Sequence, residues 1–141
     1  MPGPMEGVKV VELGVWVAAP AACGVLADWG ADVVKIEPPA GDPARTFRRM
    51  LGGDMPTNPV FELDNRGKRS IVIDLNTEAG RAIGMELLAD ADVFVTNVRA
   101  DGLARLGLDP PTLLAHNPRL VYGHISGYGL EGSDANRAAY D

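Results

Sequence analysis

Cysteine is almost absent from this 141-residue sequence: Cys23 stands alone, so no disulfide can form within the chain. Histidine is nearly as scarce, and the two histidines do not combine with Cys23 at the spacing of a metal site. We expect His116 as a surface or capping residue and His124 as a hydrogen-bonded core residue rather than a catalytic base. The sequence therefore predicts no metal ion.

Positive charge is also in deficit, with 13 Lys and Arg against 19 Asp and Glu and a net charge of -6. This balance argues against nucleic acid as the main partner. No apolar run is long enough to cross a membrane, and the first residues, MPGPMEG, lack the basic and apolar regions of a signal peptide. With Cys23 expected as a buried thiol in an alanine-rich helix, these absences predict a cytoplasmic protein without a membrane partner.

The sequence does contain a regular alternation of β-branched runs and helical stretches. It predicts strands over 8–13, 33–36, 70–75, 92–96 and 120–125. It predicts helices over 20–29, 77–91, 102–106 and 111–114. The helix over 77–91 is expected to start at a Thr77 cap and to bury Ile83, Leu87 and Leu88. Residues 38–68 contain breakers every few positions and predict a long, partly helical excursion. The fold class is therefore α/β, with a doubly wound, mainly parallel sheet.

Ligands of such sheets bind at the carboxyl ends of the strands. The segments that follow strands here are 14–19, 37–42, 97–105 and 126–132. The first of them leads into a helix whose free N–H groups could hold a phosphate, and a plain βα turn is the alternative. Gly14 is its only glycine, whereas a dinucleotide site needs Gly-x-Gly-x-x-Gly. We therefore do not expect NAD, and the alternative for Glu37 is a residue that only ends its strand.

Two basic clusters interrupt the acidic chain. The first precedes a strand and contains Arg66, Lys68 and Arg69, and the second follows a strand and contains Arg99 and Arg105. If both clusters lie at one edge of the sheet, they suit the phosphates of a ligand. Solvated loops are the alternative, because exposed charges need no ligand.

Six segments, taken together, resemble the family III CoA-transferases. They are GVKVVEL (7–13), LADWGADVVKIEPP (26–39), NRGKRSIVIDL (65–75), ADVFVTN (91–97), LARLG (103–107) and NPRLVYGHISGYG (117–129). The family includes formyl-CoA transferase, carnitine CoA-transferase and α-methylacyl-CoA racemase. The resemblance covers nearly the whole chain, in order and in spacing.

The resemblance implies that residues 1–141 form the N-terminal, CoA-binding part of the Rossmann-like large domain in an interlocked homodimer. The implied ligands are CoA or acyl-CoA and a small carboxylic acid. The loop implied to line the CoA and acyl site is Val15, Trp16, Val17 and Ala18. The residues implied to border the nucleotide and diphosphate are Lys68, Arg69, Asn97, Val98 and Arg105. Tyr128 is implied to lie near the thioester. At Pro38 some members have an arginine that reaches a CoA phosphate.

The implied activity is acyl-CoA:carboxylate CoA transfer through an aspartate nucleophile, which we expect beyond residue 141. Asp141 matches the aspartate of the family's His/Tyr-Asp pair and is not assigned as the nucleophile, so no catalytic residue is expected in this chain. Racemase members have a histidine where this chain has Tyr140, and tyrosine is a poor base at neutral pH. An α-methylacyl-CoA racemase-like enzyme is therefore the first alternative. A non-catalytic module that binds CoA or a nucleotide is the alternative of another class.

Overall fold

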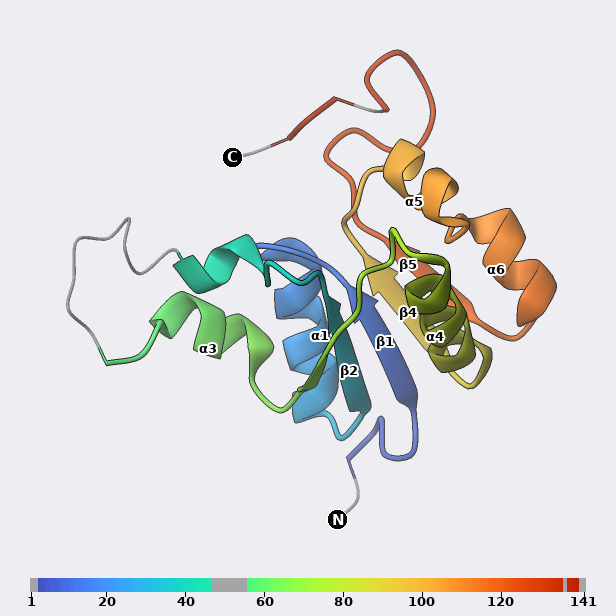
Figure 1. Cartoon of the computed structure of the whole chain (residues 1–141). Coiled ribbons are helices and arrows are strands. Elements are labelled where there is room, and N and C mark those ends of the chain that lie inside the picture. The colour runs from blue at the N-terminus through green and yellow to red at the C-terminus, as the bar shows by residue number, and fades with distance from the viewer. Residues whose placement is uncertain (1–2, 47–55, 136, 140–141) are drawn as a thin grey trace.

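The computed structural model describes residues 3–46, 56–135 and 137–139 (Figure 1). Within these ranges five parallel strands form one sheet in the order β3-β2-β1-β4-β5. The strands are β1 (Lys9–Leu13), β2 (Asp32–Glu37), β3 (Arg69–Val72), β4 (Val93–Thr96) and β5 (Val121–His124). The chain winds outward from β1 through β2 and β3, then returns to the other side of β1. This order confirms the predicted doubly wound sheet.

Helices cover both faces of the sheet, and consecutive residues of β1 belong to two separate cores. Val10 packs in the cluster that contains Ala19 and Cys23 of α1 (Ala18–Asp28). Val11 packs in the other cluster, which contains Leu88 of α4 (Glu78–Ala89). This alternation is what a strand buried on both faces requires. Cys23 is fully buried, and burial raises the pKa of its thiol to about 12.

The remaining helices are short. They are η1 (Pro43–Thr46), α3 (Pro59–Asn65), α5 (Ala100–Leu106) and α6 (Pro110–His116). The helix α3 packs beside α1, whereas α5 and α6 lie on the side of the sheet that contains β4 and β5 (Figure 1). The Thr77 hydroxyl accepts the Gly80 N–H at 3.0 Å, which confirms the predicted cap of α4. None of the described helices is both long and apolar enough to span a membrane.

Two details of the sequence prediction are wrong. The side chain of Ile83 is 46% exposed, because α4 turns Gly80, Gly84 and Leu88 toward the sheet instead. The strand β3 ends at Val72 rather than at residue 75, because its partner β2 ends opposite it. Residues 43–46 and 59–65 confirm helix within the 38–68 excursion, and residues 47–55 lie outside the described part.

Candidate functional site

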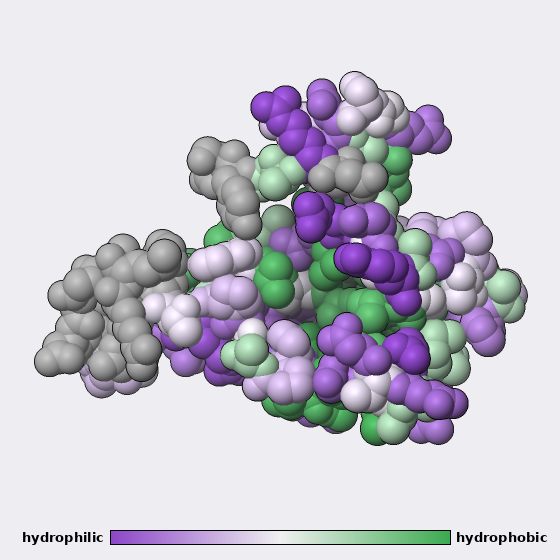
Figure 2. Space-filling model, turned by 45° about the horizontal axis from the view of Figure 1, so that its top comes forward, coloured by the Kyte–Doolittle hydropathy of each residue, from purple (hydrophilic) through white to green (hydrophobic). Residues whose placement is uncertain are grey.

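A hollow of about 570 Å³ opens at the carboxyl edge of the sheet. It lies between the loops that follow β1, β4 and β5, so it sits where the strand order reverses between β1 and β4. Figure 2, in which this edge is turned toward the reader, shows hydrophobic surface between hydrophilic groups. Such a switch point is where doubly wound sheets bind their ligands. The position agrees with three of the four strand-end segments singled out from the sequence.

The loop after β1 forms one wall of the hollow and has an unusual backbone. Trp16 has a φ of 63°, in the left-handed region that tryptophan rarely adopts. Gly14 comes so close to the following helix that a Cβ added there would lie 2.6 Å from the Ala19 Cβ. Val17 and Ala18 are exposed at the rim. A strained, partly exposed turn at a ligand-sized hollow is typical of a functional loop.

Asn97, the first residue after β4, holds this loop from one side. Its Oδ1 accepts the Val15 N–H at 3.0 Å, and its Nδ2 donates to the Val15 carbonyl at 2.8 Å. The loop that contains Asn97 is fixed in turn by His124 of β5, whose Nε2 lies 2.8 Å from the Val98 carbonyl. That nitrogen must carry the proton, because a carbonyl can only accept. The hydrogen bond of His124 is therefore confirmed, but the expected core position is wrong, because His124 is only half-buried and lines the hollow.

Asp42 and Lys35 hold the loop from below. Asp42 Oδ1 accepts the Trp16 N–H at 3.1 Å, and the Lys35 ammonium donates to the Gly14 carbonyl at 2.9 Å. The two side chains form an ion pair, with Lys35 Nζ 2.9 Å from Asp42 Oδ2. Loop 14–16 is thus fixed through four backbone polar groups.

Beneath the loop lies a chain of four buried charges. Lys35 Nζ is 2.7 Å from one oxygen of Glu12, and Lys68 Nζ is 2.6 Å from the other. With Asp42, these side chains are at most 2% exposed. Burial by itself lowers the pKa of Lys35, but Glu12 and Asp42 outweigh burial and raise it. The two positive and two negative charges balance, as buried charges must.

Glu37 ends β2 and is also buried. Its carboxylate accepts hydrogen bonds from Arg45 at 2.6 and 2.8 Å, from the Ser70 hydroxyl at 2.6 Å and from the Asp42 N–H at 3.0 Å. The Arg45 hydrogen bonds are the main reason that the pKa of Glu37 falls to about 2, although burial opposes them. Glu37 therefore holds the following loop rather than facing the hollow.

The first basic cluster differs from expectation. Lys68 donates to Glu12, to the Pro20 carbonyl at 2.7 Å and to Asn65 at 3.1 Å, which uses all three N–H bonds of its ammonium. A contact between Lys68 and a diphosphate stays a prediction, and it requires the exchange of one of these partners. Arg69 pairs with Asp32 at 2.7 Å, at the amino end of β2.

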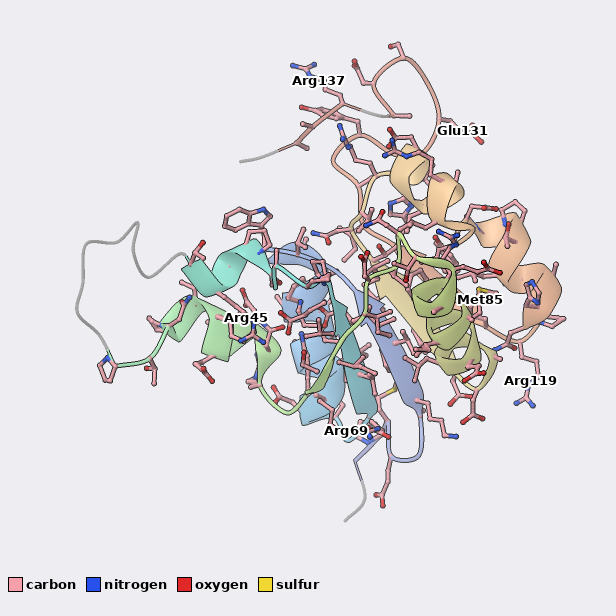
Figure 3. The ribbon with its side chains drawn as sticks, in the orientation of Figure 1. Arg45, Arg69, Met85, Arg119, Glu131 and Arg137 are labelled. Carbon is pink, nitrogen blue, oxygen red and sulfur yellow. The ribbon has the colours of Figure 1, made fainter. Side chains whose placement is uncertain are left out.

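Arg69 of the first cluster lies at the amino ends of the strands, whereas Arg99 of the second cluster lines the hollow at their carboxyl ends. The two clusters therefore do not share one edge of the sheet, contrary to the expectation. Figure 3 shows Arg69 at one end of the sheet and Arg137, which lines the hollow, beyond the other. Among the second cluster, Arg99 lines the hollow, whereas Arg105 is exposed on the last turn of α5 and outside the lining. A role for Arg69 or Arg105 at a nucleotide stays a prediction.

The remaining expected residues divide between the hollow and its surroundings. Val98 lines the hollow and is half-buried against the core. Tyr128 is 49% exposed, and the Arg137 guanidinium lies 5.3 Å from the centroid of its ring. Tyr140 and Asp141 lie outside the described residues. Over the part of the chain that is described, no group of three or more His, Cys, Asp or Glu side chains could hold a metal ion.

Sequence reasoning missed the residues that support the loop. Lys35 and Glu12 occupy buried positions of strands, where charged residues are rare unless they are paired. Charged residues within otherwise apolar strands were therefore the signal that could have identified this buried network. Asp42 is the last residue of the strand-end segment 37–42, but the sequence alone indicates no role for it. Arg137 was missed because it follows the last predicted strand without any pattern.

Comparison with known proteins agrees with this geometry. The model of CoA-transferase family III matches residues 5–141. The chain is 44% identical to cinnamoyl-CoA:phenyllactate CoA-transferase of Clostridium sporogenes, over 96% of this chain and 34% of the relative. It is 43% identical to succinate–glutarate CoA-transferase of Agrobacterium fabrum, over 98% of this chain and 36% of the relative. The chain therefore spans about a third of the length of these curated relatives.

A solved structure shows the same fold. A CAIB/BAIF family protein from Brucella suis superposes with a TM-score of 0.90 at 42% sequence identity. The match covers all of this chain and 38% of that one. The five-stranded sheet and its helices are thus an arrangement that also occurs as part of a longer protein.

Proposed function

Because this chain belongs to CoA-transferase family III, we propose that it forms the CoA-binding part of an enzyme that transfers CoA between an acyl-CoA and a carboxylic acid. The observation that carries this proposal is the hollow at the switch point of the sheet, with the strained Val15–Ala18 loop fixed at its rim. Relatives that act on different acyl groups share this part of the chain with it. A CoA carrier common to their substrates explains that sharing.

The lining of the hollow fits the chemistry of CoA. Val15, Val98 and Ile125 provide apolar contacts for the pantetheine arm, and Ser126 provides a hydroxyl for its amides. Arg99 and Arg137 place positive charge at the same hollow, and exposed Arg105 follows on α5. Guanidinium groups suit phosphates because their N–H donors match the phosphate oxygens.

The thioester end would lie near the Val15–Ala18 loop and Tyr128. Val17, the N-cap of α1, makes no side-chain cap, so the N–H groups of Ala18 and Ala19 in the first turn have no side-chain cap. Such groups favour a developing negative charge on a carbonyl oxygen. The aspartate nucleophile implied by the family resemblance is not assigned to a residue described here.

An exchange assay with the native protein that contains this chain tests the proposal. The protein is incubated with an acyl-CoA and a panel of carboxylic acids, and new acyl-CoA species are measured by mass spectrometry. We expect new thioesters that depend on the added acid. Exchange of the α-hydrogen in D₂O without any acid would instead support the racemase alternative. CoA binding with neither reaction would support a non-catalytic module.

The remaining expectations stand as proposals with their own measurements. An interlocked homodimer predicts twice the protomer mass by light scattering of the native protein. A cytoplasmic location predicts recovery of the native protein in the cytosolic fraction of its source cells.

A further inference from the structure

We propose that Asp42, acting with Lys35, is a positioning residue that holds the loop after β1 in the strained turn required for CoA binding. The inference rests on the proposed function of the hollow. It assigns the role to a side chain buried beneath the loop rather than to one that faces the ligand. Asp42 has no exposed side-chain surface, so it acts on a ligand only through the loop above it.

The two carboxylate oxygens of Asp42 have different partners. Oδ1 accepts the Trp16 N–H at 3.1 Å and the Ala44 N–H at 2.9 Å, so it joins the loop after β1 to η1. Oδ2 lies 2.9 Å from the Lys35 ammonium. A carboxylate can accept at both oxygens at once, which neither a serine nor an alanine could do. Asp42 thus places negative charge directly under the left-handed residue Trp16.

Lys35 holds the same loop at a second point. We call Asp42, Lys35 and Asn97 together the clamp, because each binds backbone groups of residues 14–16. The Lys35 ammonium donates to the Gly14 carbonyl at 2.9 Å, two residues before the N–H that Asp42 holds. Between those two contacts, Asn97 binds the N–H and the carbonyl of Val15. The backbone from Gly14 to Trp16 therefore has little freedom to leave its turn. A strained φ persists only where the surroundings determine it in this way.

The clamp is anchored in the core. Glu12 joins Lys35 to Lys68, and Lys68 donates to the Pro20 carbonyl in the first turns of α1 and to Asn65 of α3. The backbone N–H of Asp42 is itself held by Glu37 at 3.0 Å. Because these charges are buried, the loss of one leaves its partner without compensation. The network therefore fixes the loop relative to α1 and α3 together.

The test compares Asp42→Ala with Asp42→Asn in the native protein. Two quantities are measured: the hydrogen exchange of a peptide covering residues 14–18, and the dissociation constant for CoA. Asp109→Ala is the matched control. Asp109 caps α6 through the Thr112 N–H at 3.1 Å, away from the loop, so its loss destabilises the protein without releasing the turn.

We expect Asp42→Ala to speed exchange of the 14–18 peptide and to weaken CoA binding roughly tenfold, because two backbone donors and a lysine lose their acceptor. Asp42→Asn keeps an acceptor for Trp16 and should restore much of the exchange protection. Asp109→Ala should change neither quantity. If Asp42→Ala cannot be purified folded, Asp42→Asn decides, since it should weaken CoA binding severalfold through the unbalanced Lys35.

Failure of this inference is distinguishable from failure of the proposed function. If the native protein binds CoA but both Asp42 variants keep its affinity and the slow exchange of residues 14–18, the positioning role is wrong. If Asp109→Ala has the same effects as Asp42→Ala, the effects are merely structural, and the role is again wrong. If the native protein does not bind CoA at all, the proposed function itself fails.

Discussion

Arg105 is the residue whose predicted role can be tested most simply at the scale of single side chains. It is exposed on the last turn of α5, so its removal should not disturb the core. If it contacts a phosphate of CoA, Arg105→Ala should weaken CoA binding by roughly 1 to 3 kcal/mol, the cost of a lost charge-assisted hydrogen bond. Isothermal titration calorimetry of the native protein with CoA measures this change.

Arg119→Ala is the control for that substitution. Arg119 is an exposed arginine outside the lining of the hollow, and Figure 3 shows it at the other end of the molecule from Arg137. The control removes the same charge and should leave CoA affinity unchanged at moderate salt. Equal losses in both variants would point to a general charge effect and would contradict a specific role for Arg105.

Glu37 predicts a pH dependence of stability. Its pKa of about 2 lies below the ordinary value of 4.5, chiefly because of the hydrogen bonds from Arg45. The ionised form therefore stabilises the fold fully above pH 4.5, and this contribution is lost as the pH falls toward 2. This pKa shift corresponds to a contribution to the free energy of unfolding of at most about 3 kcal/mol. The actual contribution is smaller, because the Arg45 side chain is half exposed and solvent weakens its interaction with Glu37.

Urea unfolding of the wild type and of Glu37→Gln between pH 7 and pH 2.5 measures this contribution. The free energy of unfolding of the wild type should fall more steeply below pH 4.5 than that of the variant. Glu131→Gln, at an exposed glutamate, serves as the control and should follow the wild type. Parallel curves for the wild type and Glu37→Gln would show that the carboxylate is not stabilised as the structure indicates.

At the scale of elements, the contact of α4 with the turn before it depends on glycine. A Cβ added at Gly80 would lie 2.0 Å from the Asp74 carbonyl oxygen, which belongs to the backbone and cannot easily move. At Gly84 the nearest atom is the Leu75 Cδ2, at 2.9 Å, which can move with its side chain. The same substitution should therefore have different effects one helical turn apart.

We expect Gly80→Ala to lower the free energy of unfolding by about 2 kcal/mol, as overpacking against fixed atoms does. Gly84→Ala should change it by less than about 1 kcal/mol, because the helix propensity of alanine offsets the shift of Leu75. Thermal or urea unfolding of the two variants gives the comparison. Equal effects would mean that α4 does not approach Asp74 as closely as described.

The elements themselves could be predicted because their signals are local. All five strands are apolar runs near the predicted positions, and Thr77 starts α4 as expected. The predicted burial of Ile83 was wrong because α4 buries two glycines, and glycine carries no hydrophobic signal in a sequence. The limits of β3 depend on where β2 ends, and a single strand does not reveal the length of its partner.

The site could be predicted only in part, because the contacts that form it join distant segments. The sequence located the Val15–Ala18 loop and Asn97, but the bond between Asn97 and Val15 spans 82 residues. A lysine next to a strand indicates positive charge without indicating its acceptors, so Lys68 was expected at a phosphate although Glu12 binds it. Trp16 was expected in the loop, but nothing local indicated its left-handed backbone.

At the scale of the whole molecule, the carboxyl edge of the sheet is where the observations converge. The hollow, the strained loop and the clamp beneath it lie at this edge, whereas Arg69 and Asp32 pair at the other. The outer strands β3 and β5 expose Val72 and Val121, at 63% and 62%. Arginines around one hollow of an acidic chain favour the proposed binding of a small anionic ligand there.

The measurement that tests this account most directly is a crystal structure of the native protein with CoA. We predict CoA in the hollow at the carboxyl edge, with its thiol toward the Val15–Ala18 loop, its phosphates near the arginines and Trp16 still left-handed. CoA bound elsewhere on the sheet, or no CoA bound at saturating concentration, would contradict the account.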